Sequence, residues 1–580
     1  MAQIYGINGP VVKAKDAGGL MMLEKVFVGD IGLIGEVIRT EGDCVTIQVY
    51  EDTDGIKIGE KVEGTGAPLS LLLGPGLMGN IFDGILRPLP EVARLSGDFI
   101  KRGTDAPSID IEKEWKCNIT VKEGDYLSGG SVFAEVTETD VIVHRALIPP
   151  DIAGTVKKIN QKASFKVLEP VLTLSCSDGT QRDITLAQRW PIRNPRPLFK
   201  RLISDKMLFT GQRIVDTFFP ILKGGAAAIP GGFGTGKTMT QHQLAKWSDA
   251  DIIVYIGCGE RGNEMTQVLE EFSELIDPRT KKSLNDRTIL IANTSNMPVA
   301  AREASIYTGI TLAEYYRDMG YNVAIMADST SRWAEALREI SGRLEEMPAE
   351  EGFPAYLSSR LSEFYERAGY GITLNQKQAS VTIIGAVSPQ GGDFSEPVTQ
   401  NTMRYIRCFW ALDKNLAYVR HYPAINWLTS YSEYTDYLDD YYRENAGPDF
   451  VQIKSEIMKL MSEESSLMDI VKLVGSDMLP DGQKLILEVA RIVKDGYLSQ
   501  NAYNPTDTFA SMEKQYGMLK LMLMYYNLAK KKIESGATYN QVIALNLSDT
   551  LIRMKFEISN DDTDKFKAIE QQMTSAFETL

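Results

Sequence analysis

The spacing of apolar residues changes along the chain, and each pattern predicts a different kind of structure. Residues 45–50 alternate polar and apolar side chains with a period of two and run into a turn-forming cluster at 52–55, which is typical of a half-buried strand. Because several runs of this kind fall within residues 1–70, we expect an N-terminal β-barrel there. Residues 110–190 are again strand-like, and residues 71–109 are predicted to form a linker or strap.

Between residues 191 and 435, near-continuous apolar runs alternate with helical stretches. Runs of this kind predict parallel strands that helices cover on both faces, joined by right-handed crossovers. The runs lie at residues 252–256, 288–292, 323–327 and 381–387. We therefore expect a central α/β domain, with its functional residues at the edge where the strands end.

Helical spacing dominates residues 436–580. Apolar residues recur there at intervals of three and four, which marks the buried face of a helix. The clearest positions are Ile453, Ile457, Leu460, Leu485, Val489 and Ile492. The whole pattern predicts a multidomain protein with an N-terminal β-barrel, a β-rich insert, a central α/β domain and a C-terminal helical domain.

The strand-like insert is similar to the sandwiched hairpins of biotinyl and lipoyl carrier domains. The similarity rests on residues 121–125, 132–136 and 153–156. The hairpin tip that would carry a modified lysine has Thr139 and Asp140 instead. We therefore expect a structural insert and no cofactor carrier.

Residues 231–238 match the phosphate-binding pattern G-x-x-x-x-G-K-[ST]. Glycines let backbone N–H groups turn toward phosphate oxygens, while Lys237 can reach the β- and γ-phosphates and the Thr238 hydroxyl can ligate Mg²⁺. An apolar run at 226–229 precedes the loop, and residues 239–247 contain no glycine or proline. This order of strand, loop and helix favours a nucleotide site over a glycine-rich surface turn. The predicted binding positions are Gly231, Gly232, Phe233, Gly234, Thr235, Gly236, Lys237 and Thr238.

Charged residues follow two of the predicted strands. Nucleotide hydrolysis needs a metal ligand, a group that orients water, and positive charge near the γ-phosphate. Glu260 and Arg261 come after the run at 252–256, flanked by glycines at the predicted mouth of the sheet, so Glu260 is predicted to activate water and Arg261 to lie near the phosphate. Asp328 ends the run at 323–327 and is predicted to hold Mg²⁺, through a water molecule.

Composition narrows the classes of function. The chain has 580 residues, of which 43% are hydrophobic and 24% charged, as in soluble globular proteins of several domains. A formal net charge of −15 argues against a nucleic-acid groove, and so against a RecA-like nucleic-acid motor. The apolar stretch at 518–526 is too short to span a bilayer, and the first residues do not form a signal peptide. We expect a cytosolic chain.

The 5 cysteines and 3 histidines predict neither a disulfide framework nor a histidine-rich metal site. The cysteines are scattered at Cys44, Cys117, Cys176, Cys258 and Cys408. Cys258 lies close to Glu260 in the sequence, but we expect it to be a small apolar filler and not a nucleophile.

Longer runs of sequence resemble the catalytic A subunit of V-type and archaeal-type rotary ATPases. The runs are residues 210–213, 216–220, 229–234, 240–243, 259–264, 327–339, 350–357 and 388–394. The resemblance covers essentially the whole chain, including the insert, which looks like the bulge absent from F-type β subunits and type III export ATPases. It implies a RecA-like P-loop core that binds ATP or ADP with Mg²⁺, and an enzyme that hydrolyses or forms ATP.

The same resemblance implies partners. The chain would alternate with B subunits in an A3B3 hexamer, and each B subunit would supply an arginine in trans. Central-stalk rotor subunits, a peripheral stalk and a membrane ion-translocating sector would complete the assembly, with this chain on the cytoplasmic side. Either H⁺ or Na⁺ could be the transported ion, because the ion ligands belong to another subunit, and either direction of catalysis could dominate.

Carried over by position, Tyr422, Tyr503 and Gln500 would form the adenine pocket. Members often have Phe where these tyrosines stand, and a tyrosine ring still stacks on a base. The phosphate loop departs from the family at Gly232 and Thr235, which leaves loop rigidity and nucleotide affinity open.

Two interpretations have alternatives: the role of residues 475–481 and the catalytic role of the chain. Residues 475–481 resemble the acidic turn that faces the rotor in this family, although an ordinary helix–helix turn explains them equally well. The rival to a catalytic role is a non-catalytic nucleotide-binding subunit of the same ring. Such paralogues lack an intact Lys237–Thr238 loop and Glu260, and this chain has both.

Overall fold

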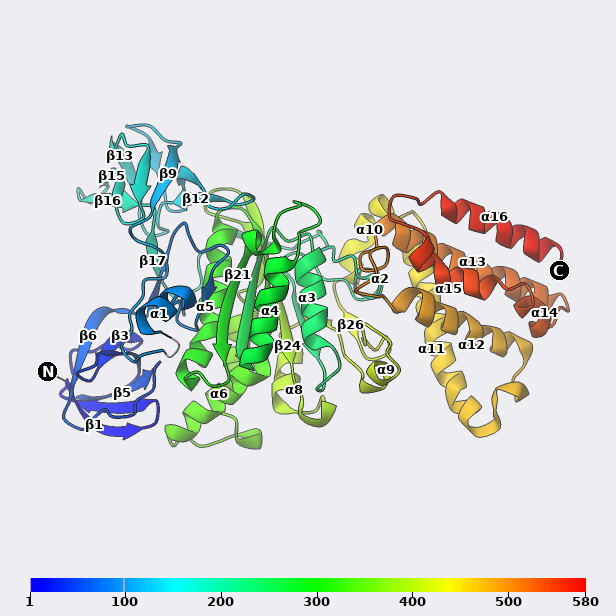
Figure 1. Cartoon of the computed structure of the whole chain (residues 1–580), viewed down its shortest axis with the longest axis horizontal. Helices are drawn as coiled ribbons and strands as arrows, with labels where there is room; N and C mark the ends of the chain where they lie inside the picture. Colours follow the sequence, from blue (N-terminus) through cyan, green and yellow to red (C-terminus); the bar gives the residue numbers. More distant parts are fainter. Residues whose placement is uncertain (1, 98–99) are drawn as a thin grey trace. The chain divides into compact units, whose positions relative to one another are not determined.

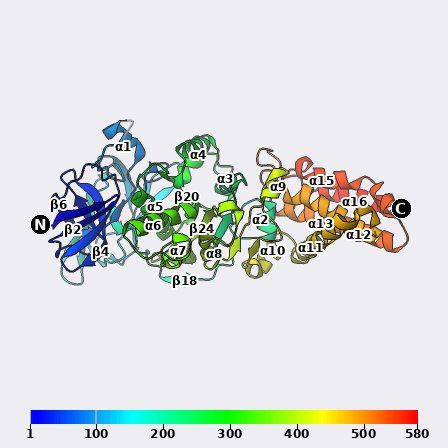
Figure 2. The same ribbon diagram turned by 90° about the horizontal axis from the view of Figure 1, so that it is seen from below.

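The computed structural model describes residues 2–97 and 100–580. The chain forms two compact units, shown in Figures 1 and 2. The first comprises the chain up to residue 203, with residues 223–228 and 250–406. The second comprises residues 204–222, 229–249 and 407–580.

The N-terminal strands close into the expected barrel, drawn in blue in Figure 1. Its strand order is β1-β2-β5-β4-β3-β6. The bounds are β1 Ala2–Asn8, β2 Val11–Lys15, β3 Glu24–Val28, β4 Leu33–Glu41, β5 Cys44–Val49 and β6 Lys61–Pro68. Alternate residues such as Val26, Val28 and Ile47 are buried inside, so a small barrel fills its own core and leaves no open edge.

The insert consists of two four-stranded antiparallel sheets, with orders β10-β13-β15-β16 and β12-β11-β9-β14. The bounds are β9 Glu114–Ile119, β10 Tyr126–Leu127, β11 Val132–Thr137, β12 Val143–Leu147, β13 Gly154–Ile159, β14 Ser164–Lys166, β15 Pro170–Cys176 and β16 Gln181–Thr185. At the hairpin tip, Thr139 Oγ1 donates to the Asp286 carbonyl at 2.8 Å, and Asp140 pairs with Lys282 at 2.7 Å. These contacts fasten the tip to the central domain, as suits a structural insert.

The segment predicted as a strap has secondary structure of its own. It contains β7 (Ser70–Leu73), β8 (Ile81–Phe82) and α1 (Leu89–Ser96). β7 pairs antiparallel with β17 (Gln188–Pro191), and β8 pairs parallel with a strand of the central sheet. Burial of the leucine side chains of β7 explains why this segment is a strand and not a free linker.

The central sheet of the first unit contains the four predicted parallel strands, in the order β24-β22-β20-β21 with β8 at the edge. β19 (Ala226–Pro230) precedes the phosphate loop in the chain. The other bounds are β18 Lys200–Leu202, β20 Ile252–Glu260, β21 Thr288–Thr294, β22 Asn322–Asp328, β23 Gly369–Ile372 and β24 Gln378–Val387. The helices are α4 Gly262–Glu274, α5 Val299–Asp318, α6 Thr330–Arg343, α7 Leu357–Tyr365 and α8 Pro397–Met403. Parallel pairing brings the carboxyl ends of β20 and β22 to the same edge.

The second unit is mainly helical, with the short antiparallel pair β25 (Cys408–Phe409) and β26 (Tyr431–Ser432). Its helices are α2 Arg213–Phe218, α3 Lys237–Trp247, α9 Lys414–Tyr418, α10 Asp439–Asn445, α11 Phe450–Val474, α12 Asp481–Val493, α13 Met512–Glu534, α14 Tyr539–Ile543, α15 Leu547–Glu557 and α16 Lys565–Glu578. The apolar positions predicted on α11 and α12 are all buried. Among the described residues, no helix combines the length and apolarity needed to cross a membrane.

Candidate functional site

The phosphate loop has the backbone geometry that its glycines predict. β19 leads the chain to Gly231, and α3 begins at Lys237 with Gly236 as its N-cap. Gly234 and Gly236 have φ angles of 78° and 89°. Residues with a side chain rarely adopt such angles, so both positions require glycine. The loop therefore leads into the amino end of α3, and the N–H groups and partial positive charge of a helix amino end can bind phosphate.

Gly232 and Thr235 of the phosphate loop are hydrogen-bonded to each other. The Thr235 hydroxyl is buried and donates to the Gly232 carbonyl at 2.8 Å. A Cβ atom at position 232 would meet Lys414 Cε at 2.4 Å, so a larger residue there would require Lys414 to move. Lys237 Nζ donates to the carbonyls of Gly231 and Gly232 at 2.7 and 3.3 Å. The ammonium group therefore lies over the loop.

A cavity of about 460 Å³ adjoins the start of α3 within the second unit. Tyr422, Gln500 and Tyr503 all line it, together with Gly236 of the phosphate loop. The Tyr422 ring lies beside Gly236 of the loop. A Cβ atom added at Gly236 would be 3.6 Å from Tyr422 Cε1, which is ordinary van der Waals contact. Tyr503 is 83% exposed. Aromatic walls beside a phosphate loop suit the base and phosphates of one nucleotide.

Most residues of the cavity wall were not among the sequence predictions. Lys555 and Phe556, at the end of α15, line the same cavity. They lie more than 300 residues after the phosphate loop and belong to no motif. α15 shows only ordinary amphipathic spacing, so no sequence signal could have assigned them to this site.

Gln500 lines the cavity with its amide group bonded to the protein. Its Oε1 accepts from the Arg213 N–H at 2.8 Å, and its Nε2 donates to the carbonyls of Gly211 and Asp507 at 2.9 and 2.8 Å. Its own backbone N–H donates to the Tyr422 carbonyl at 2.8 Å. Gln500 therefore connects the segment that carries Tyr503 to the segment that carries Tyr422.

The predicted acidic residues lie at the ends of neighbouring strands in the first unit. Glu260 is the last residue of β20 and Asp328 the last of β22. β20 continues to Glu260 because Cys258 and Glu260 pair with Asn293 and Thr294 of β21, and this pairing outweighs the weak strand propensity of the glycines.

The electrostatic environment of Glu260 favours its protonated form. Burial raises the pKa of Glu260 to about 8, and the carboxylates of Asp328 and Glu264 contribute to the rise. Asp328 is itself 3% exposed, and its Oδ2 accepts from the Tyr255 hydroxyl at 3.2 Å. Strongly shifted carboxyl groups of this kind are typical of functional sites.

Arg261 and Cys258 flank this region in different ways. Arg261 is exposed and forms the N-cap position of α4. Cys258 is fully buried, and burial raises the pKa of its thiol to about 12. A thiol with this pKa is a poor nucleophile at neutral pH, as expected for a packing residue.

The predicted site residues thus fall into two groups. Gly236 of the phosphate loop, Tyr422, Gln500 and Tyr503 line one cavity in the second unit, whereas Glu260, Arg261 and Asp328 belong to the first unit. Within the described residues, no cluster of three or more His, Cys, Asp or Glu side chains is arranged to hold a metal ion. Mg²⁺ rarely uses such all-protein cages and relies on one or two oxygen ligands with substrate phosphates. The Thr238 hydroxyl and the Asp328 carboxylate are ligands of the type Mg²⁺ prefers, and their roles stay predictions.

Four family models match consecutive parts of the chain. The β-barrel domain of the ATP synthase alpha/beta family matches residues 4–66, and the barrel-sandwich domain of ATP synthase alpha/beta subunits matches 106–193. The nucleotide-binding domain of the same family matches residues 211–432. The C-terminal domain of V- and A-type ATP synthases matches residues 439–543. These matches confirm the expected fold classes in their expected order.

Individual relatives match over the full length. The V-type ATP synthase alpha chain 2 of Clostridium tetani is 60% identical and covers 100% of this chain, with 97% of its own length matched. The V-type ATP synthase alpha chain of Halothermothrix orenii is 58% identical, and the A subunit of the A-type ATP synthase of Methanopyrus kandleri is 53% identical, each covering 100% of this chain and matched over 98% of its own length.

Among solved structures, the assembled type III secretion ATPase EscN of enteropathogenic E. coli shares the fold. Its TM-score is 0.65 at 20% identity, over 90% of this chain and 100% of that one. The full-length identities above are far higher and include the C-terminal domain specific to V- and A-type enzymes. The chain belongs to the family of V-type and A-type ATP synthase alpha (A) subunits.

Proposed function

We propose that this chain is the catalytic subunit of a V/A-type rotary ATP synthase, which hydrolyses or forms ATP and couples that turnover to transport of H⁺ or Na⁺. The observation that carries the proposal is the intact loop from Gly231 to Thr238, which opens directly into α3 beside an aromatic-walled cavity. The membership of the family supports it. ATP and ADP are the proposed ligands of this loop.

We assign the phosphate-binding roles from side-chain chemistry. Lys237 neutralises the β- and γ-phosphate oxygens, and the backbone N–H groups at the start of α3 bind the same anion. Thr238 and Asp328 would hold Mg²⁺, Asp328 through a water molecule. When bound, the ion offsets negative charge on the phosphates.

Glu260 is the proposed general base that accepts a proton from the attacking water. Its raised pKa reflects burial and its acidic neighbours, so added positive charge nearby would favour the carboxylate form that can accept the proton. Arg261, exposed beside it in the chain, is the proposed cation near the γ-phosphate. A carboxylate and a cation at this position match the needs of phosphoryl transfer.

We propose that the working form is an A3B3 hexamer with B subunits that each provide an arginine in trans. Central-stalk rotor subunits, a peripheral stalk and a membrane ion-translocating sector would complete the complex. A net charge of −15 suits basic protein partners and disfavours nucleic acid. The rival function, a non-catalytic ring subunit, has no feature in its favour here, because both the loop and Glu260 are intact.

Replacement of the loop lysine tests the proposal. Lys237→Ala should abolish ATP turnover and weaken nucleotide binding, since the variant lacks the ammonium group that neutralises the phosphates. Mg²⁺-dependent ATPase activity of the complex with its B partner is the measurement, with Lys246→Ala at the far end of the same helix as the control. Near-normal turnover by Lys237→Ala would show that this loop is not the catalytic one.

A further inference from the structure

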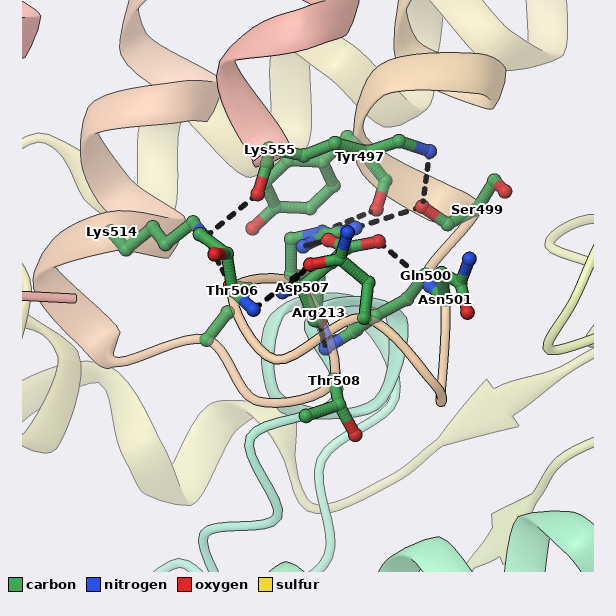
Figure 3. Close-up of polar contacts among 12 residues, drawn as sticks. Arg213, Tyr497, Ser499, Gln500, Asn501, Thr506, Asp507, Thr508, Lys514 and Lys555 are labelled. Atoms are coloured by element: carbon green, nitrogen blue, oxygen red, sulfur yellow. Dashed lines mark hydrogen bonds and ion pairs between the residues drawn. The ribbon is translucent and has the colours of Figure 1, made fainter. Parts of the chain in front are cut away.

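The buried side chain of Arg213 forms hydrogen bonds with the chain segment that carries Tyr503 (Figure 3). Arg213 is the first residue of α2, and its side chain is 0% exposed. Its Nε donates to the Tyr497 carbonyl at 2.7 Å and its Nη2 to the Ser499 carbonyl at 2.8 Å. Its Nη1 donates to Asp507 Oδ1 at 2.6 Å. One guanidinium group therefore binds the chain on both sides of the turn at residues 500–506.

The Asp507 carboxylate connects the two ends of this turn, because it accepts hydrogen bonds from both Arg213 and the Asn501 backbone. Its second oxygen, Oδ2, accepts from the Asn501 backbone N–H at 2.7 Å, and its side chain is also 0% exposed. The Gln500 amide adds a bond to the Asp507 carbonyl at 2.8 Å. We define residues 499–507 as the Tyr503 loop, and its beginning and end are bonded both to each other and to Arg213.

The Tyr503 loop forms part of the cavity wall. Ser499, Gln500, Asn501 and Ala502 line the cavity together with Tyr503. The Gln500 backbone N–H is bonded to the Tyr422 carbonyl, so the two aromatic walls are connected through the loop. Tyr503 itself is 83% exposed, so few contacts of its own ring hold it in place. Its position depends on the base of the loop, where Arg213 and Asp507 act.

The cluster also contains more positive than negative charge. Lys514 Nζ donates to the carbonyls of Thr506 and Lys555, and Lys555 Nζ donates to the carbonyls of Asp495 and Ser499. Burial, with a smaller contribution from Arg213, lowers the pKa of Lys514 to about 8, while Asp507 opposes the change. Asp507 is therefore the carboxylate that balances several buried cations, and its loss would leave them uncompensated.

We propose that Arg213 and Asp507 are positioning residues, which hold the Tyr503 loop so that its ring can stack on the nucleotide base. The inference rests on the proposed function, because it assumes that the cavity receives the base of ATP. Neither residue lines the cavity, and their side chains bond to residues 497–507, so the pair should affect base binding and leave phosphate binding at the loop of residues 231–238 unchanged. Base–aromatic stacking contributes enough affinity for such a change to be measured.

A purely structural ion pair is the alternative, and the chain provides a matched control. Arg287 and Asp277 form a second buried pair, with side chains 2% and 0% exposed. This pair belongs to the first unit, whereas the cavity belongs to the second. Loss of a buried charge at Asp277 should cost stability without a selective effect on base binding.

The experiment compares ligands with and without a base. Asp507→Asn, Arg213→Lys and the control Asp277→Asn are made in the full chain, and calorimetry measures the Kd for Mg-ATP and for Mg-tripolyphosphate. We expect Asp507→Asn to raise the Kd for ATP at least tenfold and to change that for tripolyphosphate less than twofold. Arg213→Lys keeps the charge but loses the forked bonds, so it should shift the ATP value in the same direction by at least threefold.

Three results would overturn the inference. The ATP affinity of folded Asp507→Asn could be unchanged, both ligands could weaken equally, or Asp277→Asn could show the same selective loss. If Asp507→Asn does not fold, Arg213→Lys decides, and an unchanged ratio of the two Kd values contradicts the proposal. If the unmodified chain binds neither ligand, the proposed nucleotide site itself is wrong, and with it the inference.

Discussion

Glu260→Gln separates the chemical role of the carboxyl group from its effect on stability. The substitution keeps the shape of the side chain and removes its negative charge and its capacity to accept a proton. General bases typically contribute roughly 10²–10⁴-fold to rate, so we expect turnover to fall by that factor while nucleotide binding is retained. The same substitution should stabilise the fold at high pH, because Glu260 ionises there beside other carboxylates.

The size of the stability effect follows from the raised pKa. A pKa of about 8 in place of 4.5 corresponds to at most ~5 kcal/mol of differential free energy. We expect ~2 kcal/mol, because Glu260 is only partly buried and water screens its neighbours. Since the folded pKa lies above the unfolded one, the favourable contribution of protonated Glu260 is present below pH 4.5 and is lost as the pH rises through 8.

Thermal unfolding without Mg²⁺ at pH 9 and pH 5.5 measures this contribution. Glu260→Gln should unfold about 2 °C above the unmodified chain at pH 9, and the difference should shrink at pH 5.5. Asp393→Asn, an exposed carboxyl whose pKa is lowered by bonds to Ser395, is the control and should show no gain at pH 9. A variant that is less stable at pH 9, or that loses ATP affinity in proportion to rate, would refute both the electrostatic argument and the role of Glu260 as a base.

Two further predictions concern the second unit. Tyr422→Ala should raise the KM for ATP about tenfold with little change in kcat, because the aromatic wall is lost while the catalytic groups remain. Tyr422→Phe is the control and should keep the KM and kcat of the unmodified chain. An effect of Tyr422→Ala on kcat alone would contradict the cavity assignment. The stability of Lys514→Met should depend less on pH than that of the unmodified chain. The pKa of Lys514 is about 8 in the folded chain and near 10.4 in the unfolded chain. The free energy of unfolding of the unmodified chain should therefore rise, relative to the variant, by on the order of 1 kcal/mol per pH unit between pH 8 and 10. Unfolding midpoints at pH 7.5 and 9.5 measure this difference, and parallel curves would show that Lys514 is charged throughout.

Local patterns were sufficient to predict much of the fold. The apolar runs at 252–256 and 323–327 became β20 and β22 because strands covered on both faces require uninterrupted apolar sequence. The phosphate loop could be predicted because its chemistry is fixed by a short stretch of adjacent residues. Both features depend on neighbours in the sequence, which a pattern can show directly.

Features that depend on distant residues were not accessible in this way. Arg213 and Asp507 lie nearly 300 residues apart, and no motif indicates that they pair. Lys555 and Phe556 reach the cavity only through the packing of α15. The continuation of β20 to Glu260 depends on pairing with β21, which the apolar run at 252–256 alone does not show.

Gly232 and Thr235, whose effect on the loop the sequence left open, interact directly in the structure. Together they form a buried hydrogen bond of 2.8 Å across the loop. We therefore expect the two positions to act as a unit, so that a change at one affects the other.

The most direct test of the account is the ATPase rate of this chain with and without its B partner. The proposed site lacks its trans arginine when the chain is alone, and such arginines contribute on the order of 10³–10⁵ to rate in other phosphoryl-transfer systems. Addition of the B partner should therefore raise turnover by orders of magnitude, with less than a threefold change in the affinity of the phosphate loop for ATP. Full activity from a demonstrably monomeric preparation of this chain would contradict the shared site and indicate a self-sufficient ATPase.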